Sequence, residues 1–169
     1  MDESKIEFSG VQMGVPTGAE FTSFSSEIDF DRDDLAAGAV KVVIDLDSVT
    51  ASYPVLAQVL RQEPWFNVAE FPRATFEATD VSALGEDSFE ARGTLTLRGV
   101  TQPSSLTFSF LTYGPNPDKA GWAKAVMNGE TTLQRTAFEV GQGEWGATDI
   151  VADEVTIKVH FSAERPIAP

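Results

Sequence analysis

The stretch that determines the fold class is residues 89–97, which read FEARGTLTL. Apolar or small residues occupy every second position from Phe89 to Leu97, and charged or polar residues such as Glu90 and Arg92 occupy the positions between them. Successive side chains of a β-strand point to opposite faces of the sheet. The stretch therefore predicts a strand with one buried face and one solvated face.

The same alternation recurs on both sides of this stretch. It predicts seven further strands, at residues 6–8, 24–30, 40–46, 74–78, 106–110, 122–133 and 155–161. Turn residues separate several of them, such as Gly85-Glu86-Asp87 and Arg98-Gly99. Strands joined mainly by short turns indicate an all-β antiparallel meander, which either closes into a barrel or folds as a sandwich.

One segment follows a helical period instead. Between Pro54 and Gln62, the apolar residues Val55, Leu56, Val59 and Leu60 fall on one face of a helix. Proline is favoured in the first turn of a helix, and Pro64 prevents its continuation. We therefore expect a short helix between the third and fourth predicted strands, where it covers one end of the sheet.

Composition restricts the class of protein. The 169 residues, 42% of them hydrophobic, are enough for one domain with its own core, so residues 1–169 are predicted to form a single domain. The net charge of −14 opposes binding to nucleic acid. No apolar run is long enough to cross a bilayer, and Met1 begins a chain with no signal-peptide pattern, so such a peptide is either absent or already removed.

No catalytic or metal-binding pattern emerges from the residues. Cysteine is absent, and the single histidine, His160, alternates with apolar neighbours on the polar face of the last strand. The acidic residues in 29–34 lack the glycine and glutamate spacing of a calcium loop, and residues 141–143 are not followed by a helix that could bind phosphate. We therefore predict a protein that is not an enzyme, with no metal site and no required cofactor.

The three tryptophans leave an alternative function open. Exposed tryptophans on a β-sandwich can stack on sugar rings, and Trp122 and Trp145 are the candidates for such a carbohydrate-binding module. Trp65 and Phe66 directly follow the predicted helix and are expected to pack beneath it.

Phenylalanine is common, with 12 copies, and most of them lie in phase on the predicted strands. A small barrel can point such residues into a filled core or around a ligand cavity. The period of the pattern does not distinguish these two cases.

Two motifs go beyond periodicity. Residues 71–79, FPRATFEAT, and residues 93–103, GTLTLRGVTQP, resemble the hallmark motifs of the YceI-like polyisoprenoid-binding family. The resemblance extends over nearly the whole chain, to residues 18–21, 28–31, 65–68, 133–141 and 153–155. It implies an antiparallel, eight-stranded, lipocalin-like barrel that holds a polyisoprenoid lipid and carries no catalytic residues.

The resemblance also carries expectations about ligand, location and partners. Members of the family are usually exported, so a periplasmic or secreted protein is expected. Residues 12–14 and 143–145 are similar to the branch associated with membrane b-type cytochromes. That likeness implies a prenylated quinone, for example ubiquinone, as ligand and a membrane or cytochrome partner, while a homodimer is the other candidate assembly.

The expected ligand contacts combine strand parity with this resemblance. The residues predicted to contact the lipid are Ile6, Phe8, Phe24, Ile28, Val42, Ile44, Leu56, Val59, Leu60, Trp65, Phe66, Phe76, Leu95, Leu97, Phe108, Phe110, Met127, Phe138, Val155, Ile157 and Phe161. Where the family commonly has a polar R-D-x-H stretch, this chain has Leu-Ala-Gln-Val at 56–59. We therefore expect a more apolar cavity mouth, with Gln58 or Arg61 meeting any polar head group.

Overall fold

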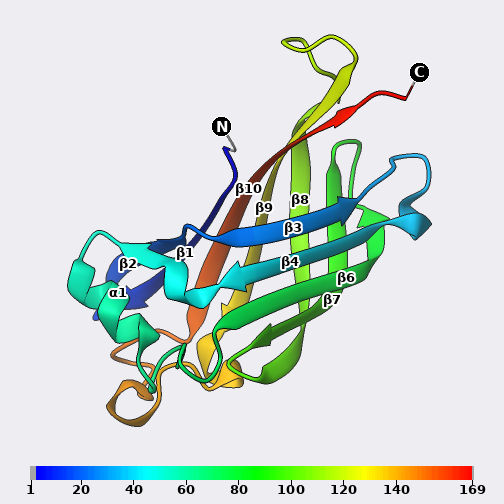
Figure 1. The fold of residues 1–169 in the computed structure, drawn as a ribbon. Helices are drawn as coiled ribbons and strands as arrows, with labels where there is room; N and C mark the ends of the chain where they lie inside the picture. The colour runs from blue at the N-terminus through cyan, green and yellow to red at the C-terminus, as the bar shows by residue number, and fades with distance from the viewer. Residues whose placement is uncertain (1–2, 169) are drawn as a thin grey trace.

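A computed structural model of the chain describes residues 3–168, and its main feature is one antiparallel sheet of ten strands that curls on itself (Figure 1). The strands are β1 (Lys5–Gln12), β2 (Val15–Phe21), β3 (Phe24–Asp29), β4 (Ala39–Asp45), β5 (Val49–Ala51), β6 (Arg73–Ala83), β7 (Ser88–Leu97), β8 (Val100–Pro115), β9 (Trp122–Gln134) and β10 (Glu154–Pro166). Their order in the sheet is β3-β4-β6-β7-β8-β9-β10-β1-β2-β5. The expectation about a signal peptide concerns Met1, which lies outside the described residues.

The helical parts are short. The α-helix α1 spans Pro54–Arg61 and lies between β5 and β6, with Pro54 in its first turn. Single 3-10 turns occur at Leu35–Ala37, Leu46–Ser48, Arg135–Phe138 and Gly143–Trp145. No helix among residues 3–168 is long and apolar enough to span a membrane.

The predicted fold class is confirmed, but the number of strands was wrong. The eight predicted strands correspond to β1, β3, β4, β6, β7, β8, β9 and β10, and the helix lies between the third and fourth of these, as expected. The sequence did not reveal β2 and β5. Most residues of β2, VPTGAEF, are small or polar, and β5 has only three residues, so neither shows a clear apolar alternation.

The two edge strands of the sheet, β3 and β5, meet at one corner. The chain passes directly from β2 into β3 through Thr22 and Ser23, and from β4 into β5 through the turn at Leu46–Ser48. Backbone hydrogen bonds join these two connections, from Thr22 N to the Ser48 carbonyl at 3.4 Å and from Asp45 N to the Ser23 carbonyl at 3.0 Å. The curled sheet therefore encloses a central space with two distinct ends.

One end of this space is filled with aromatic rings. Phe30, Phe89, Phe108, Phe110 and Tyr113 form what we call the closed-end cluster, in which neighbouring ring centroids lie 4.8–5.9 Å apart. The guanidinium carbon of Arg32 lies 4.9 Å from the centroid of the Tyr113 ring and 5.5 Å from that of Phe110. Offset and edge-to-face ring packing of this kind stabilises a core beyond the area it buries, so this end is solid.

Candidate functional site

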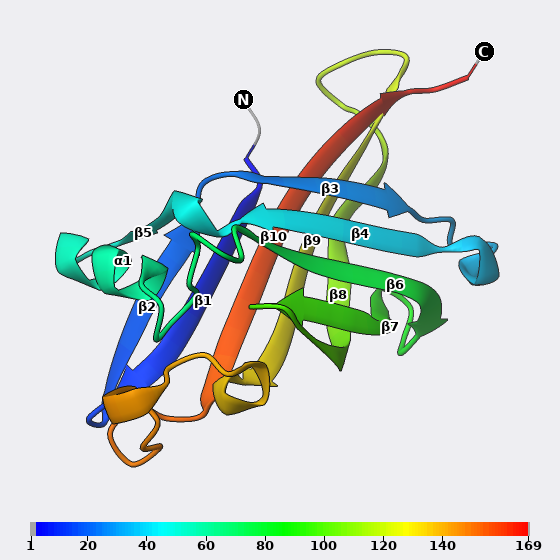
Figure 2. The ribbon, with the colours of Figure 1, turned by 60° about the horizontal axis from the view of Figure 1, so that its bottom comes forward.

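The other end of the barrel is hollow. A cavity of about 590 Å³ lies between α1, the strands β1, β2 and β10, and the segment from Arg135 to Ala152 that follows β9. Figure 2 shows these parts together, with the β1–β2 turn beside the segment drawn in orange and α1 above them. The wall is made almost entirely of aliphatic and aromatic side chains.

The residues predicted to contact a ligand fall into two groups. Twelve of them line the cavity, namely Ile6, Phe8, Ile44, Leu56, Val59, Leu60, Trp65, Phe66, Leu95, Leu97, Val155 and Ile157. They come from strands that are distant in the sequence and from α1, so the fold brings them together.

The other nine are packed in the hydrophobic core and do not line the cavity. They are Phe24, Ile28, Val42, Phe76, Phe108, Phe110, Met127, Phe138 and Phe161, all of them buried or half-buried in the hydrophobic core. They do not border this cavity, and their contact with the lipid stays a prediction. Strand parity identifies the face on which a strand residue's side chain lies, but not whether that side chain borders a void.

The cavity also has lining residues that sequence reasoning missed. Half of them come from β2, such as Thr17, Ala19 and Phe21, or from the segment after β9, such as Val140 and Val151. In β2 the residues at 17, 19 and 21 do alternate, but only Phe21 is large. The segment after β9 has no strand or helix periodicity that could have indicated it.

Three phenylalanines pack against one another in the cavity wall. The Phe8 and Phe21 rings are stacked with centroids 5.1 Å apart, and the Phe66 ring lies 5.9 Å from each of them. Phe8 belongs to β1, Phe21 to β2, and Phe66 follows α1. We call these three residues the cavity aromatics, because they border the void.

Arg135 is the only charged residue among the described residues that line the cavity. It is 2% exposed, and its guanidinium donates to the carbonyls of Val140, Gly141, Val151 and Ala152 at 2.7–3.1 Å. Burial lowers the pKa of Arg135, and the Asp153 carboxylate partly opposes that shift. The guanidinium therefore holds the segment after β9 in place.

Gly141 makes this arrangement possible. Its φ of +81° is in the left-handed region, and a Cβ at this position would collide with the Arg135 guanidinium. The backbone N–H groups of Gly141 and Gln142 both donate to the Pro64 carbonyl at 2.8 Å. Residues 141–143 are thus a turn that joins the segment after β9 to the residues after α1.

Two tryptophans form another part of the wall. The rings of Trp65 and Trp145 lie 5.8 Å apart, and the buried indole nitrogen of Trp65 has no hydrogen-bond partner among the described residues. Trp122 lies at the start of β9, with the Lys119 ammonium 3.1 Å from its ring centroid. Trp122 and Trp145 therefore form no common sugar-stacking platform, and the single curled sheet differs from the sandwich of the carbohydrate alternative.

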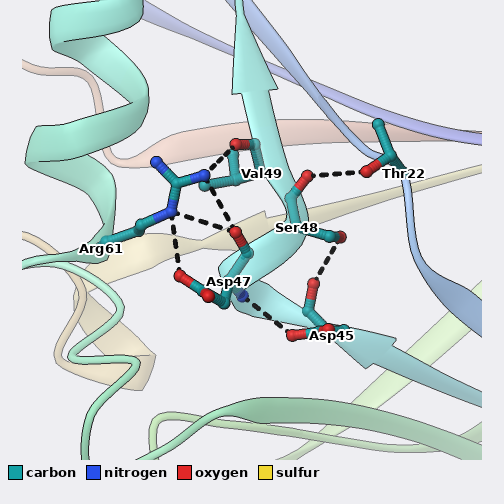
Figure 3. A network of polar contacts seen from close by, with 6 residues as sticks. All are labelled: Thr22, Asp45, Asp47, Ser48, Val49 and Arg61. Carbon is teal, nitrogen blue, oxygen red and sulfur yellow. Dashed lines mark hydrogen bonds and ion pairs between the residues drawn. The ribbon is translucent and has the colours of Figure 1, made fainter.

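Arg61 anchors α1 at the corner of the sheet (Figure 3). Its guanidinium donates to the carbonyls of Asp47 and Val49 at 2.8–3.0 Å and forms an ion pair with the Asp47 carboxylate at 3.0 Å. That Gln58 or Arg61 meets a polar head group stays a prediction. Arg61 is engaged at the corner, and the exposed Gln58 is not part of the cavity wall.

The other polar features of the sequence have local partners. A ring nitrogen of His160 lies 2.6 Å from the Asn128 side-chain oxygen on the neighbouring strand β9. The Asp31 carboxylate accepts a hydrogen bond from the Asp33 backbone N–H at 2.9 Å and closes a turn. In the part of the chain that the structure describes, no group of three or more histidines and carboxylates could hold a metal ion.

Comparison with known proteins identifies close similarity in sequence. A family model described as the YceI-like domain matches residues 1–163. A UPF0312 protein of Azotobacter vinelandii is 33% identical over 120 residues, which are 71% of this chain and 62% of that protein. A UPF0312 protein of Yersinia pestis is 39% identical over 114 residues, which are 68% of this chain and 59% of that protein. The matched region therefore spans only about three-fifths of these relatives.

Solved structures share the fold. BcnA of Burkholderia cenocepacia superposes with a TM-score of 0.87 at 30% identity, covering 95% of this chain and 96% of BcnA. A polyisoprenoid-binding domain of Saccharophagus degradans, implicated in plant cell wall breakdown, superposes with a TM-score of 0.69 at 21% identity, covering 96% of this chain and 94% of that domain. The curled ten-stranded sheet is thus the lipocalin-like fold of these proteins.

Proposed function

Because the chain belongs to the YceI-like domain family, we propose that its cavity binds a long-chain polyisoprenoid lipid. The observation that carries this proposal is the void of about 590 Å³ at one end of the barrel, walled by apolar side chains. Apolar cavities of this size are typical small-molecule sites. The relative from Saccharophagus degradans, described as a polyisoprenoid-binding domain, supports the same class of ligand.

The chemistry of the wall suits a branched hydrocarbon chain. Moving such a chain from water into the cavity gains about 0.8 kcal/mol for each buried CH₂ group, before the cost of ordering the chain. The cavity aromatics Phe8, Phe21 and Phe66 and the aliphatic side chains of α1 offer contacts of this kind along the void. Because the cavity opens to solvent beside the exposed Tyr53 and Val55, a longer chain can extend past the mouth.

We propose further that the head group is uncharged. The single cation in the wall, Arg135, already donates to four backbone carbonyls, and the net charge of −14 opposes a phosphate group. Gln12, Thr17 and Tyr53 are polar groups that border the same cavity, and the Trp65 indole N–H has no acceptor within residues 3–168. A prenylated quinone, for example ubiquinone, has carbonyl oxygens that can accept such hydrogen bonds.

The biological role that fits this site is transport or storage of the lipid without chemical change. No nucleophile paired with a base borders the cavity among the residues that line it. A periplasmic or secreted location, and a cytochrome as the protein that uses a bound quinone, remain part of this proposal.

The first test is to identify what the purified protein carries. Organic extraction followed by mass spectrometry is expected to recover a prenyl lipid in near-stoichiometric amount. Stable protein that is repeatedly free of lipid, and that takes up none from a prenyl-lipid mixture, would contradict the proposal.

A second test uses the tryptophans of the wall as reporters. In a Trp122→Phe variant, the remaining emission comes from Trp65 and Trp145, which both border the cavity. Titration of delipidated protein with a prenylated quinone is expected to quench this emission to saturation. A quinone head without its prenyl tail serves as the control and is expected to bind far more weakly, because it buries little apolar surface.

A further inference from the structure

The mouth of the cavity is surrounded by exposed apolar side chains. We call Val11, Met13, Val15, Tyr53, Val55 and Ile150 the apolar rim; each is 37–76% exposed. Val11, Tyr53 and Val55 also line the cavity, so the rim is continuous with its wall. Contiguous exposed apolar surface of this kind marks an interaction site in a protein that otherwise buries such residues.

Three parts of the chain bring the rim together. Val11, Met13 and Val15 belong to the β1–β2 hairpin, Tyr53 and Val55 to the start of α1, and Ile150 to the segment after β9. The Met13 backbone N–H donates to the Ile150 carbonyl at 2.7 Å, and the Ala152 N–H donates to the Val11 carbonyl at 2.8 Å. The backbone of the hairpin tip is therefore joined to that of the segment after β9, and the two lie side by side at the lower left of Figure 2.

The hairpin turn itself has an unfavourable residue at its tip. Met13 and Gly14 have φ of +50° and +76°, and they connect Gln12 and Val15, which are paired in the β1–β2 ladder. Two-residue turns with two positive φ values favour Asn-Gly, and a methionine there costs conformational free energy. Met13 is also 76% exposed, so neither turn geometry nor core packing accounts for this side chain.

Two of the three rim segments carry no charge. Residues 8–19 and residues 48–60 contain no Asp, Glu, Lys or Arg, although 22% of the whole chain is charged. In the third segment, Asp149 adjoins Ile150 and Asp153 lies three residues beyond it. The rim is therefore suited to a surface that is apolar and without negative charge, since anionic headgroups would be repelled by a chain of net charge −14.

We propose that the apolar rim docks on a zwitterionic lipid bilayer and opens the cavity directly to the acyl-chain region. This proposal rests on the proposed function, because a prenyl chain that leaves a membrane through water would lose its apolar surroundings. With the rim inserted at the interface, the chain passes from bilayer to cavity along continuous apolar contacts. Continuity of rim and cavity is what favours a bilayer over a protein partner.

The test is flotation of the lipid-loaded protein with phosphatidylcholine vesicles, using a variant designed to keep the fold. Met13→Asn places the preferred residue at the turn, and Val15→Thr keeps a β-branched residue in β2. Neither Met13 nor Val15 lines the cavity, so the wall is unchanged. The double variant is expected to bind vesicles at least about tenfold more weakly than the parent, because two apolar side chains no longer enter the interface.

The matched control removes exposed apolar side chains far from the mouth. Leu84 and Leu111 are 57% and 63% exposed, and they lie in the β6–β7 turn and in β8. The double variant Leu84→Gln and Leu111→Gln is expected to float like the parent. Raising the salt concentration is expected to leave vesicle binding by the parent unchanged, because the rim residues that contact the bilayer include no basic side chain.

Several results would overturn the proposal. They are a parent protein that does not float, equal flotation of the hairpin variant, or binding that falls steeply with salt. A parent dimer that becomes monomeric in the hairpin variant and does not float would instead assign the rim to self-association. In solution, the hairpin variant should bind the quinone with the same affinity as the parent. If the parent floats with vesicles but takes up no lipid, the proposed function is wrong and the docking surface stands.

Discussion

The two ends of the barrel are built from the same kinds of residue, yet one is filled and the other is hollow. At the closed end, Phe89 and Phe108 are 3% and 2% exposed, and their rings contact other rings of the closed-end cluster. At the cavity end, Phe8 and Phe66 also contact each other, but they border a void of about 590 Å³. Aromatic content alone therefore does not create a cavity.

The two ends differ in the elements that cover them. The closed end is crossed by Phe30 and Arg32, from the connection between β3 and β4, which press onto the rings of β7 and β8. The cavity end is covered by α1, which Arg61 anchors to the corner of the sheet, and by the segment after β9, whose backbone carbonyls Arg135 holds together. The backbone contacts of these two arginines support a wall without filling the space behind it.

The largest effect on stability is expected from Phe108→Ala. Removing a ring from a solidly packed core should lower the free energy of unfolding by about 3–5 kcal/mol. The matched variant Phe8→Ala should cost less, about 1–3 kcal/mol in delipidated protein, because one side of that ring already lacks contacts. Urea unfolding of both variants measures the difference, and equal losses would show that the cavity end is packed as tightly as the closed end.

Removal of the ligand should have an intermediate effect on stability, and its effect on hydrogen exchange should be confined to the cavity end. A ligand present at about 100 times its Kd stabilises the folded protein by about 2.7 kcal/mol. Delipidation should lower the midpoint of thermal unfolding and increase amide hydrogen exchange in α1 and β2, while β7 and β8 exchange as before. A uniform increase over the whole sheet would show that the two ends are not independent.

The smallest effect on stability is expected from Gly10→Phe. A Cβ at Gly10 would meet only Val155 Cγ2 at 4.0 Å, and Gly10 is not among the glycines with positive φ. The new ring should enter the cavity and change the free energy of unfolding by no more than about 1 kcal/mol, since it removes a void without crowding. Titration with a prenylated quinone should nevertheless show binding reduced at least about tenfold; unchanged affinity would place the ligand elsewhere.

The all-β class, eight of the ten strands, the helix at Pro54–Arg61 and the family could all be predicted from the sequence. Each of these depends on local patterns, either a period of two, a helical period or a motif of adjacent residues. The helix and the residues Trp65 and Phe66 after it were identified as part of the site for the same reason, because they are close together in the chain.

Which apolar side chains border the void could not be predicted from the sequence, because it depends on how distant segments pack. Ile44 and Val42 lie two positions apart on one face of β4, and yet Ile44 lines the cavity while Val42 is packed in the core. Parity gives the face of a strand, whereas position along the barrel axis depends on strand register and on the elements that cover each end. The buried cation Arg135 was equally hidden in the sequence, because its four carbonyl partners come from a segment without periodicity that only the fold brings around it.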